Sequence, residues 1–312
     1  MGATYVIGTG GIGLFLQHVL QDAVGSILLA REGTRAVLAR EPLRVTGTLE
    51  GERSLHVEAW EALGDLAADD TVFVATGSHD ALTVLERLSS RIADGTRVVM
   101  CQNAIGMHAR AVEALPQARH VRLHNWLGSH KRGPAHIDIL GIFKVDLAGS
   151  DADALATWQG VFEGAGIHAT AGDDPAHAEW TKALWTIALH GICTLADAPI
   201  GIVQADPAME RLARALMAEA VAAAAAEGLA LRDQDVNDVI QWVAAAPQLR
   251  NATLRDLEAG RPHDLGWFNG AVVEVARRHG VPAPLNEAVL ALVDARQAER
   301  AKAQNEKRAQ EA

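Results

Sequence analysis

The sequence predicts two structural classes in succession: an α/β domain built on a doubly wound, mostly parallel sheet, followed by an all-α domain. Three observations predict this. A short apolar strand opens the chain and runs directly into a glycine-rich turn and an apolar-periodic helix. Near-continuous apolar strands then alternate with helices. From Pro175 onward only helical periodicity remains, so we expect residues 1–172 and 173–312 to form separate domains.

Composition and charge limit the kind of protein. The chain has 312 residues, of which 49% are hydrophobic and 21% charged, which is enough to bury the cores of two domains. Its net charge of −11 argues against nucleic acid or an anionic membrane as a partner. The two cysteines, the lack of an export pattern at the N-terminus and the lack of a run of about 18 apolar residues favour a cytoplasmic protein.

The opening strand and its turn are typical of a dinucleotide site. Residues 3–7 form the expected strand, and a G-x-G-x-x-G pattern follows at once. Gly8 permits the turn, Gly10 lets a diphosphate approach the backbone, and Gly13 lets helix and strand pack closely. A purely structural turn is the alternative. We expect the cofactor to contact Gly8, Thr9, Gly10, Gly11, Ile12 and Gly13.

The tip of the second strand predicts which dinucleotide is bound. Residues 26–30 form this strand, and Arg31 comes directly after it, followed by Glu32. A planar guanidinium suits the 2′-phosphate of NADP, whereas a carboxylate suits the ribose hydroxyls of NAD. Arg31 therefore favours NADP(H), while Glu32 keeps NAD open and a solvated loop arginine is the structural alternative.

The following segments complete the predicted sheet. Residues 43–47 and 54–57 are expected to form a hairpin insertion. The other predicted strands are 71–76, 97–101, 121–126, 137–147 and 167–170, with helices at 80–92 and 153–163. Gln102 and Asn103 follow one of these strands, so we expect both at the carboxyl edge of the sheet, beside the cofactor. Asn103 could equally cap the next helix.

Lys182 is the residue of most interest in the helical half. The predicted helices are 175–195, 207–227, 233–245, 251–259, 264–279 and 286–308. Lys182 lies in an apolar run of the first of them, where poor hydration would lower its pKa and prepare it to donate a proton. Thr186 and His190 share its helix face, which suggests a polar line directed into a cleft. A lysine that reaches solvent from the edge of a core helix is the alternative.

Together these segments resemble the ketopantoate reductase family, nearly end to end. The resemblance rests on the glycine turn, Gln102-Asn103, Trp180-x-Lys182, the run from Leu254 to Asp264 and Asn269-Gly270. It implies a Rossmann domain and a helical domain, with NADPH reducing a small 2-oxo acid to a 2-hydroxy acid in the cleft between them. That reaction would connect the protein with pantothenate biosynthesis. A homodimer, paired through the helical domains, is left open.

The resemblance also implies residue roles. Lys182 corresponds to the general acid, Asn103 to an amide at the nicotinamide end, Arg31 to the residue on the 2′-phosphate, and Asp264 to an acidic position beside the substrate. Asp264 could instead cap the helix that follows it. His263 is expected at the surface rather than in catalysis.

The departures from the family concern the substrate. Thr186 and His190 stand where the family usually has asparagines, and Ala252, beside Asn251, stands where it has a serine. Replacing amides that bind a buried substrate leaves polar groups unpaired, so we expect a substrate other than 2-dehydropantoate. Thr186, His190 and Asn251 are the predicted substrate-binding residues. His190 is expected to titrate near neutrality, with a core histidine bonded to a backbone carbonyl as the alternative.

Three functions stay open. The first is an NADPH-dependent 2-oxo acid reductase, which in the reverse direction is a 2-hydroxy acid dehydrogenase. The second is the same scaffold acting on another ketone, alcohol or imine. The third is a non-catalytic NADP-sensing protein, against which the lysine in an apolar helix argues. No metal is expected, because the 13 histidines show no paired-ligand spacing.

Overall fold

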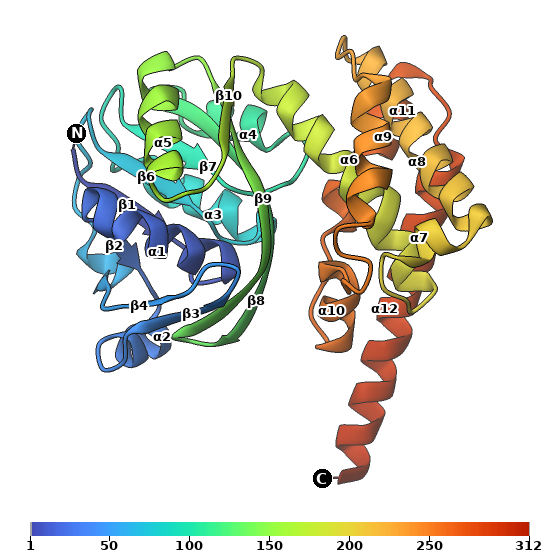
Figure 1. The fold of residues 1–312 in the computed structure, drawn as a ribbon, viewed down its shortest axis with the longest axis horizontal. Coiled ribbons are helices and arrows are strands. Elements are labelled where there is room, and N and C mark those ends of the chain that lie inside the picture. The colour runs from blue at the N-terminus through green and yellow to red at the C-terminus, as the bar shows by residue number, and fades with distance from the viewer. Residues whose placement is uncertain (1, 312) are drawn as a thin grey trace. The chain divides into compact units, whose positions relative to one another are not determined.

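The chain is described by a computed structural model that covers residues 2–311, the side chains of Phe143 and of residues 307–311 excepted. It divides into two compact units, Met1–Ala178 and Glu179–Ala312. The first unit contains the strands and the second is helical, which confirms the predicted fold class (Figure 1). The domain boundary at residues 172 and 173 stays a prediction.

A single mixed sheet organises the first unit. Within the described residues the strand order is β4-β3-β9-β8-β7-β6-β1-β2-β5, and β10 pairs with β9. From β8 to β2 neighbouring strands are parallel, whereas β8 and β9 are antiparallel. The strands are β1 (Thr4–Ile7), β2 (Ile27–Leu29), β3 (Leu43–Gly47), β4 (Gly51–Arg53), β5 (His56–Glu58), β6 (Thr71–Val74), β7 (Arg97–Met100), β8 (Arg119–Gly133), β9 (His136–Gly149) and β10 (Ala169–Gly172).

Helices connect the parallel strands. They are α1 (Gly11–Val24), α2 (Glu32–Leu38), α3 (Ser78–Leu88), α4 (Met107–Ala114) and α5 (Ala152–Gly164). Because β1, β2 and β6 are parallel neighbours, their carboxyl ends meet at one edge of the sheet. The turns after these three strands therefore lie together, and they position the site described below.

The predicted hairpin of residues 43–47 and 54–57 is wrong in its second strand. β3 forms its antiparallel pair with β4, whereas β5 pairs in parallel with β2, at the other end of the strand order. Arg53 explains the route of the chain, because its guanidinium contacts both His18 and Asp22 on α1. Leu55 and Val57 then pack against the apolar core, which favours this edge of the sheet over a second hairpin strand.

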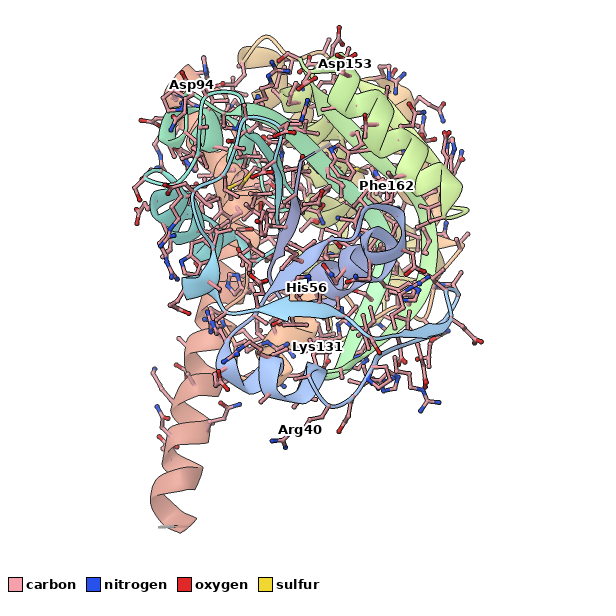
Figure 2. All side chains as sticks on the ribbon, turned by 90° about the vertical axis from the view of Figure 1, so that its left-hand side faces the viewer. Arg40, His56, Asp94, Lys131, Asp153 and Phe162 are labelled. Atoms are coloured by element: carbon pink, nitrogen blue, oxygen red, sulfur yellow. The ribbon has the colours of Figure 1, made fainter. Side chains whose placement is uncertain are left out.

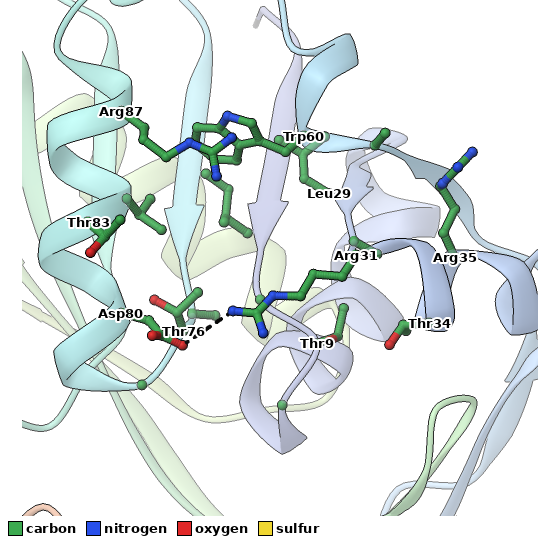
Figure 3. A pocket seen from close by; sticks show the side chains of 18 of the residues that line it. Thr9, Leu29, Arg31, Thr34, Arg35, Trp60, Thr76, Asp80, Thr83 and Arg87 are labelled. Carbon is green, nitrogen blue, oxygen red and sulfur yellow. Dashed lines mark ion pairs between the residues drawn. The ribbon is translucent and has the colours of Figure 1, made fainter.

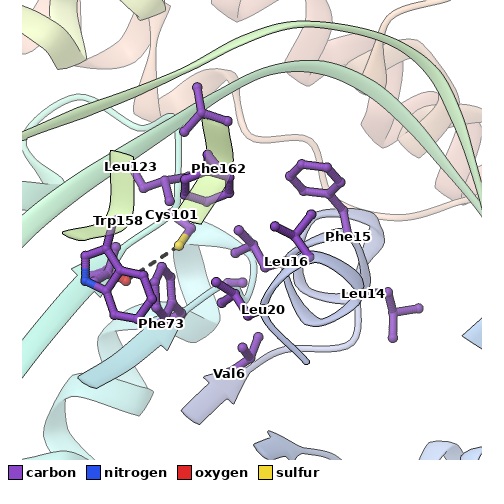
Figure 4. Packing of buried hydrophobic residues seen from close by; sticks show 14 of the residues in the cluster. Val6, Leu14, Phe15, Leu16, Leu20, Phe73, Cys101, Leu123, Trp158 and Phe162 are labelled. Atoms are coloured by element: carbon purple, nitrogen blue, oxygen red, sulfur yellow. Dashed lines mark hydrogen bonds between the residues drawn. The ribbon is translucent and has the colours of Figure 1, made fainter. Parts of the chain in front are cut away.

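The core of the first unit lies between the sheet and its helices. Phe73 of β6 meets Trp158 of α5 edge to face, with ring centroids 4.8 Å apart (Figure 4). Phe15 and Leu16 of α1 are fully buried in the same cluster. Such burial stabilises the folded state by about 25 cal/mol for each Å² of apolar surface removed from water. It holds α1, and with it the turn before α1, rigidly against the sheet.

The β8–β9 hairpin extends past its neighbour. β8 pairs with β7 only through Arg119–Arg122, and its later residues continue beside β9 as far as Gly133. Register shifts interrupt this pairing at three places, and such bulges bend and twist a strand pair. Figure 1 shows the curved pair in green, and Figure 2 shows Lys131 near its tip.

The second unit consists of helices. In the described residues these are α6 (Pro175–Leu195, which begins in the first unit), α7 (Ile202–Ala205), α8 (Pro207–Ala226), α9 (Asp233–Val243), α10 (Ala252–Glu258), η2 (Leu265–Trp267), α11 (Asn269–His279) and α12 (Pro284–Glu311). Ala220, Ala223 and Ala224 of α8 are fully buried, so the alanine-rich run belongs to a core helix. No helix of the described residues has both the length and the apolar character that crossing a bilayer requires.

Candidate functional site

The glycine turn between β1 and α1 requires glycine at two positions. Gly8 has a φ of +123°, in the region that side chains rarely adopt, and a Cβ there would lie 2.6 Å from the backbone of Ala75. A Cβ on Gly13 would lie 1.9 Å from the carbonyl oxygen of Gly8. The close packing of helix, turn and strand predicted from the sequence is therefore observed.

Gly10 leaves the turn open instead. A Cβ built on Gly10 would have no atom within 4 Å, so the backbone there is accessible to a ligand. Gly10 is the N-cap of α1 and has no side chain that could accept from the first N–H groups, and the first turn of α1 carries no acidic residue. The N–H groups of Gly11, Ile12 and Gly13 thus begin a helix whose positive end is not neutralised. This geometry fits an anionic group such as a diphosphate.

A cavity of about 730 Å³ adjoins the turn (Figure 3). Its wall is formed by the ends of β1, β2 and β6, the first residues of α2, one side of α3 and the segment after β5. Gly8, Thr9 and Gly10 of the turn belong to this wall, as does Arg31. The volume is in the range of small-molecule and cofactor sites.

Arg31 stands at the rim of the cavity. Its side chain is 92% exposed, and its guanidinium lies 3.8 Å from the carboxylate of Asp80 (Figure 3). Glu32, which could have served the ribose of NAD, forms an ion pair with Arg35 one turn along α2. The cation is therefore accessible at the end of β2, while the neighbouring carboxylate already has a partner.

Trp60 and Arg87 are wall residues that were not identified from the sequence. Trp60 follows β5 in a short 3-10 turn (η1, Trp60–Ala62), and the guanidinium of Arg87 on α3 stacks 4.1 Å from the centre of its ring (Figure 3). Trp60 was missed because residues 43–57 were predicted to form a hairpin. The segment after β5 reaches the cavity only because β5 pairs in parallel with β2. The signal available was a tryptophan directly after a short strand.

Gln102 and Asn103 lie after β7, as predicted. Gln102 is buried, and its Nε2 donates to the carbonyl oxygens of Val74 and Thr76, at 2.9 and 3.0 Å. It therefore holds the end of β6 in place. Asn103 does not cap the next helix, because the N-cap of α4 is Gly106, so this alternative is wrong. The Oδ1 of Asn103 is buried and has no hydrogen-bond partner in the described part of the chain.

In the second unit, α6 carries a polar line on a buried face. Lys182 and Thr186 are only 7% and 5% exposed, so the alternative of a lysine that reaches solvent is wrong. His190, one turn beyond Thr186, has its Nδ1 3.2 Å from the hydroxyl of Thr253. Burial, together with the charges of Lys182 and Arg255, lowers the pKa of His190 to about 3.

His190 is consequently neutral at physiological pH, and the expectation that it titrates near neutrality is wrong. Its side-chain partner is a hydroxyl rather than a backbone carbonyl. The charge of Arg255 contributes to the low pKa of His190. Arg255 was not identified from the sequence, although it lies in the run from Leu254 to Asp264 that carries the family resemblance. Burial lowers the pKa of Arg255 as well. Two basic side chains, Lys182 of α6 and Arg255 of α10, therefore lie near the polar face of α6.

Asn251 makes structural contacts through both ends of its side-chain amide. Its Oδ1 accepts from the N–H of Leu254, which caps α10, and from the hydroxyl of Thr194. Its Nδ2 donates to the carbonyl oxygen of His190 at 3.4 Å. Asn251 thus joins α10 to α6, and its predicted contact with substrate stays a prediction.

Asp264 does not cap a helix. It precedes the 3-10 turn η2 without a side-chain capping bond, and α11 begins only at Asn269, so the alternative role is wrong. His263 lies with its side chain 6% exposed and its Nε2 2.9 Å from Asp294, which corrects the expectation of a surface histidine. In the described residues no group of three or more potential metal ligands gathers at any place.

Comparison with known proteins gives consistent matches. The family model described as "Ketopantoate reductase PanE/ApbA" matches residues 4–151, and "Ketopantoate reductase PanE/ApbA C terminal" matches residues 174–297. The 2-dehydropantoate 2-reductase of Mycobacterium tuberculosis is 26% identical over 296 residues, which cover 93% of this chain and 96% of that protein.

Two solved structures share the fold. The 2-dehydropantoate 2-reductase from Geobacter metallireducens superposes with a TM-score of 0.84 at 23% identity, covering 94% of this chain and 99% of that one. D-mandelate dehydrogenase, solved with NADH and anilino(oxo)acetate, superposes with a TM-score of 0.83 at 19% identity, covering 95% and 99%.

Proposed function

The chain belongs to the ketopantoate reductase family, and we propose on that premise that it is an NADPH-dependent reductase of a small 2-oxo acid. The observation that carries the proposal is the burial of Lys182, only 7% exposed, at the position that matches the general acid of the family. Burying an ammonium group lowers the stability of the fold. A role of Lys182 in the chemistry accounts for its presence at this buried position.

NADP(H) is the proposed cofactor. The open backbone at Gly10 and the unneutralised start of α1 support a diphosphate there, and the accessible guanidinium of Arg31 supports a 2′-phosphate. A bound nicotinamide would supply the hydride. The buried, unpartnered Oδ1 of Asn103 offers an acceptor for the N–H donors of a carboxamide.

In the proposed mechanism Lys182 acts on the carbonyl oxygen of the substrate. Its ammonium stabilises the negative charge that develops on this oxygen and then donates a proton to it from Nζ. Withdrawal from water strengthens the electrostatic part of this effect. Asp264 is proposed to bind a polar group of the substrate or to keep Lys182 charged.

A second candidate is the reduction of a bulkier ketone. Thr186 is smaller than the asparagine it replaces, and His190 is neutral and bonded to Thr253. Trp185 and Trp267 are only half-buried and could line a site for an aromatic group. D-mandelate dehydrogenase, which shares the fold, was solved with an aromatic oxo acid derivative. We therefore include aromatic 2-oxo acids among the proposed substrates.

A non-catalytic NADP sensor is the third candidate, and the experiment separates it from the other two. NADPH and NADH oxidation is followed with a panel of 2-oxo acids that includes 2-dehydropantoate, pyruvate and phenylglyoxylate. We expect turnover with NADPH and at least one 2-oxo acid other than 2-dehydropantoate. Binding of NADPH without turnover on any member, in either direction, would contradict the reductase proposal and favour the sensor.

A further inference from the structure

A lysine from the β8–β9 hairpin contacts the glycine turn. The Nζ of Lys131 donates a hydrogen bond to the carbonyl oxygen of Thr9, with 2.7 Å between the two atoms. The same strand brings the hydroxyl of Ser129 so close to Gly11 that a Cβ on Gly11 would lie 2.3 Å from it. The end of β8 therefore packs directly on the turn. The position of Lys131 is fixed by the packing of its strand as well as by its own hydrogen bond.

The charge of Lys131 lacks an acidic partner. Among the described residues no carboxylate pairs with its ammonium, whereas the next residue, Arg132, pairs with Asp138, and Lys144 pairs with Asp146. An ammonium has three N–H donors, and Thr9 accepts one of them. Lys131 is exposed as a whole, but the neighbouring turn partly desolvates its ammonium, which lowers the pKa of Lys131. A cation in this state gains from an anion placed beside it.

The turn offers the surroundings of such an anion. Thr9 and Gly10 line the cavity, the backbone at Gly10 is open, and the first turn of α1 has no acidic residue. Arg31 also belongs to the cavity wall, but at the end of β2. The first unit thus provides one cation at the turn and another at the second strand. NADP carries phosphate at two corresponding positions, the diphosphate and the 2′-phosphate, whereas NAD carries only the diphosphate.

We propose that Lys131 binds the diphosphate of the dinucleotide that the glycine turn holds. This rests on the proposed function in one respect, that the ligand is a nicotinamide dinucleotide. The carbonyl of Thr9 fixes the ammonium, and the remaining N–H donors serve the diphosphate oxygens. Because the diphosphate is common to NAD and NADP, Lys131 acts on both, whereas Arg31 acts only where a 2′-phosphate is present.

Equilibrium binding to the full chain tests this proposal. Calorimetry gives the Kd of NADP+, NAD+ and 2′-AMP for the wild type, Lys131→Gln and Lys131→Arg; 2′-AMP carries the 2′-phosphate but no diphosphate. We expect Lys131→Gln to weaken both dinucleotides about 10-fold and to leave 2′-AMP within about twofold. Lys131→Arg should recover most of the loss, and the loss should shrink at high salt.

Arg132→Gln is the matched control, because it removes the neighbouring charge from the same hairpin without touching Thr9. We expect its affinities to equal those of the wild type. If Lys131→Gln weakened 2′-AMP as much as NADP+, the lysine would only hold the shape of the turn and the proposal would be overturned. Unchanged affinity for both dinucleotides would overturn it too. If instead the proposed cofactor were wrong, the wild type itself would bind neither dinucleotide, and this result is distinct from the two outcomes above.

Discussion

The guanidinium of Arg31 lies 3.8 Å from the carboxylate of Asp80 at the rim of the cavity, and the two side chains are 92% and 65% exposed. Such an exposed ion pair contributes only about 0–1 kcal/mol to the stability of the fold, because both charges remain hydrated. Arg31 can therefore leave Asp80 for a ligand phosphate at little cost.

Arg31→Ala should change the choice of cofactor. We expect the Kd of NADP+ to rise at least about 10-fold, since a charge-assisted contact to the 2′-phosphate is lost. The Kd of NAD+, which lacks that phosphate, should stay within about twofold. Calorimetric titration of both dinucleotides measures this, with Arg40→Ala as the control for charge. Equal losses for NAD+ and NADP+ would contradict the role given to Arg31.

Two glycines of the turn should respond differently to alanine. Gly13→Ala places a Cβ 1.9 Å from the carbonyl oxygen of Gly8, so we expect a lower thermal midpoint. Gly10→Ala meets no atom within 4 Å, so the fold should be unaffected while dinucleotide binding weakens, because the Cβ blocks the approach of the diphosphate. Thermal unfolding and NADPH titration separate the two effects.

Gly33→Ala is the control for this pair, since Gly33 lies in α2, has open space around it and is not part of the cavity wall. It should change neither the thermal midpoint by much nor the affinity for NADPH. Wild-type affinity in Gly10→Ala would show that the ligand does not rest on this part of the turn.

Much of the fold could be predicted because the apolar strands and the periodic helices are local signals. α6, for example, begins at Pro175 and ends at Leu195 as its pattern indicates. The route of residues 51–58 could not be predicted, because three-residue strands carry almost no periodicity. The contact of Arg53 with His18 and Asp22 of α1 decides the route, and these residues are 35 and 31 positions away in the sequence.

His190 should contribute to the acid sensitivity of the protein. Its pKa is about 3 in the folded chain against 6.5 in the unfolded one, so only the unfolded state takes up a proton between these values. Stability from the neutral histidine is complete above the unfolded pKa and is lost as the pH falls toward the folded pKa. The slope is up to about 1.4 kcal/mol per pH unit.

His190→Gln removes this ionisation. Urea denaturation at about pH 7 and about pH 5 should show that the variant loses less stability on acidification than the wild type does. The other buried histidines act alike in both proteins and cancel in the comparison. Parallel losses in the two proteins would mean that His190 titrates normally.

The double change Thr186→Asn with His190→Asn should raise activity with 2-dehydropantoate. It supplies the two amides that the family usually has at these places on α6, and amide groups can bind the hydroxyls and carboxylate of that substrate. Steady-state kinetics with NADPH measures kcat/KM. Thr186→Val, which removes the hydroxyl without adding an amide, should bring no gain. If the double variant did not gain either, the altered residues would not explain substrate choice.

The candidate site could be predicted only where a residue type carries its own chemistry. The glycine turn, Arg31 and Lys182 became candidates on this ground, and their roles stay predictions. The contact of Lys131 with Thr9 was not predicted, because 122 positions separate them and only the folding of the β8–β9 hairpin brings them together. The ionisation of His190 was also mistaken, since it depends on the burial of the side chain and on the charges of Lys182 and Arg255.

Lys182→Ala tests the central claim most directly. NADPH oxidation with the 2-oxo acid that the wild type reduces is measured beside the Kd of NADPH, with Lys302→Ala, an exposed lysine of α12, as the control. We predict that kcat falls at least about 100-fold, because the proton donor is lost, while the Kd of NADPH stays within about twofold. A kcat within a few-fold of the wild-type value would contradict the account.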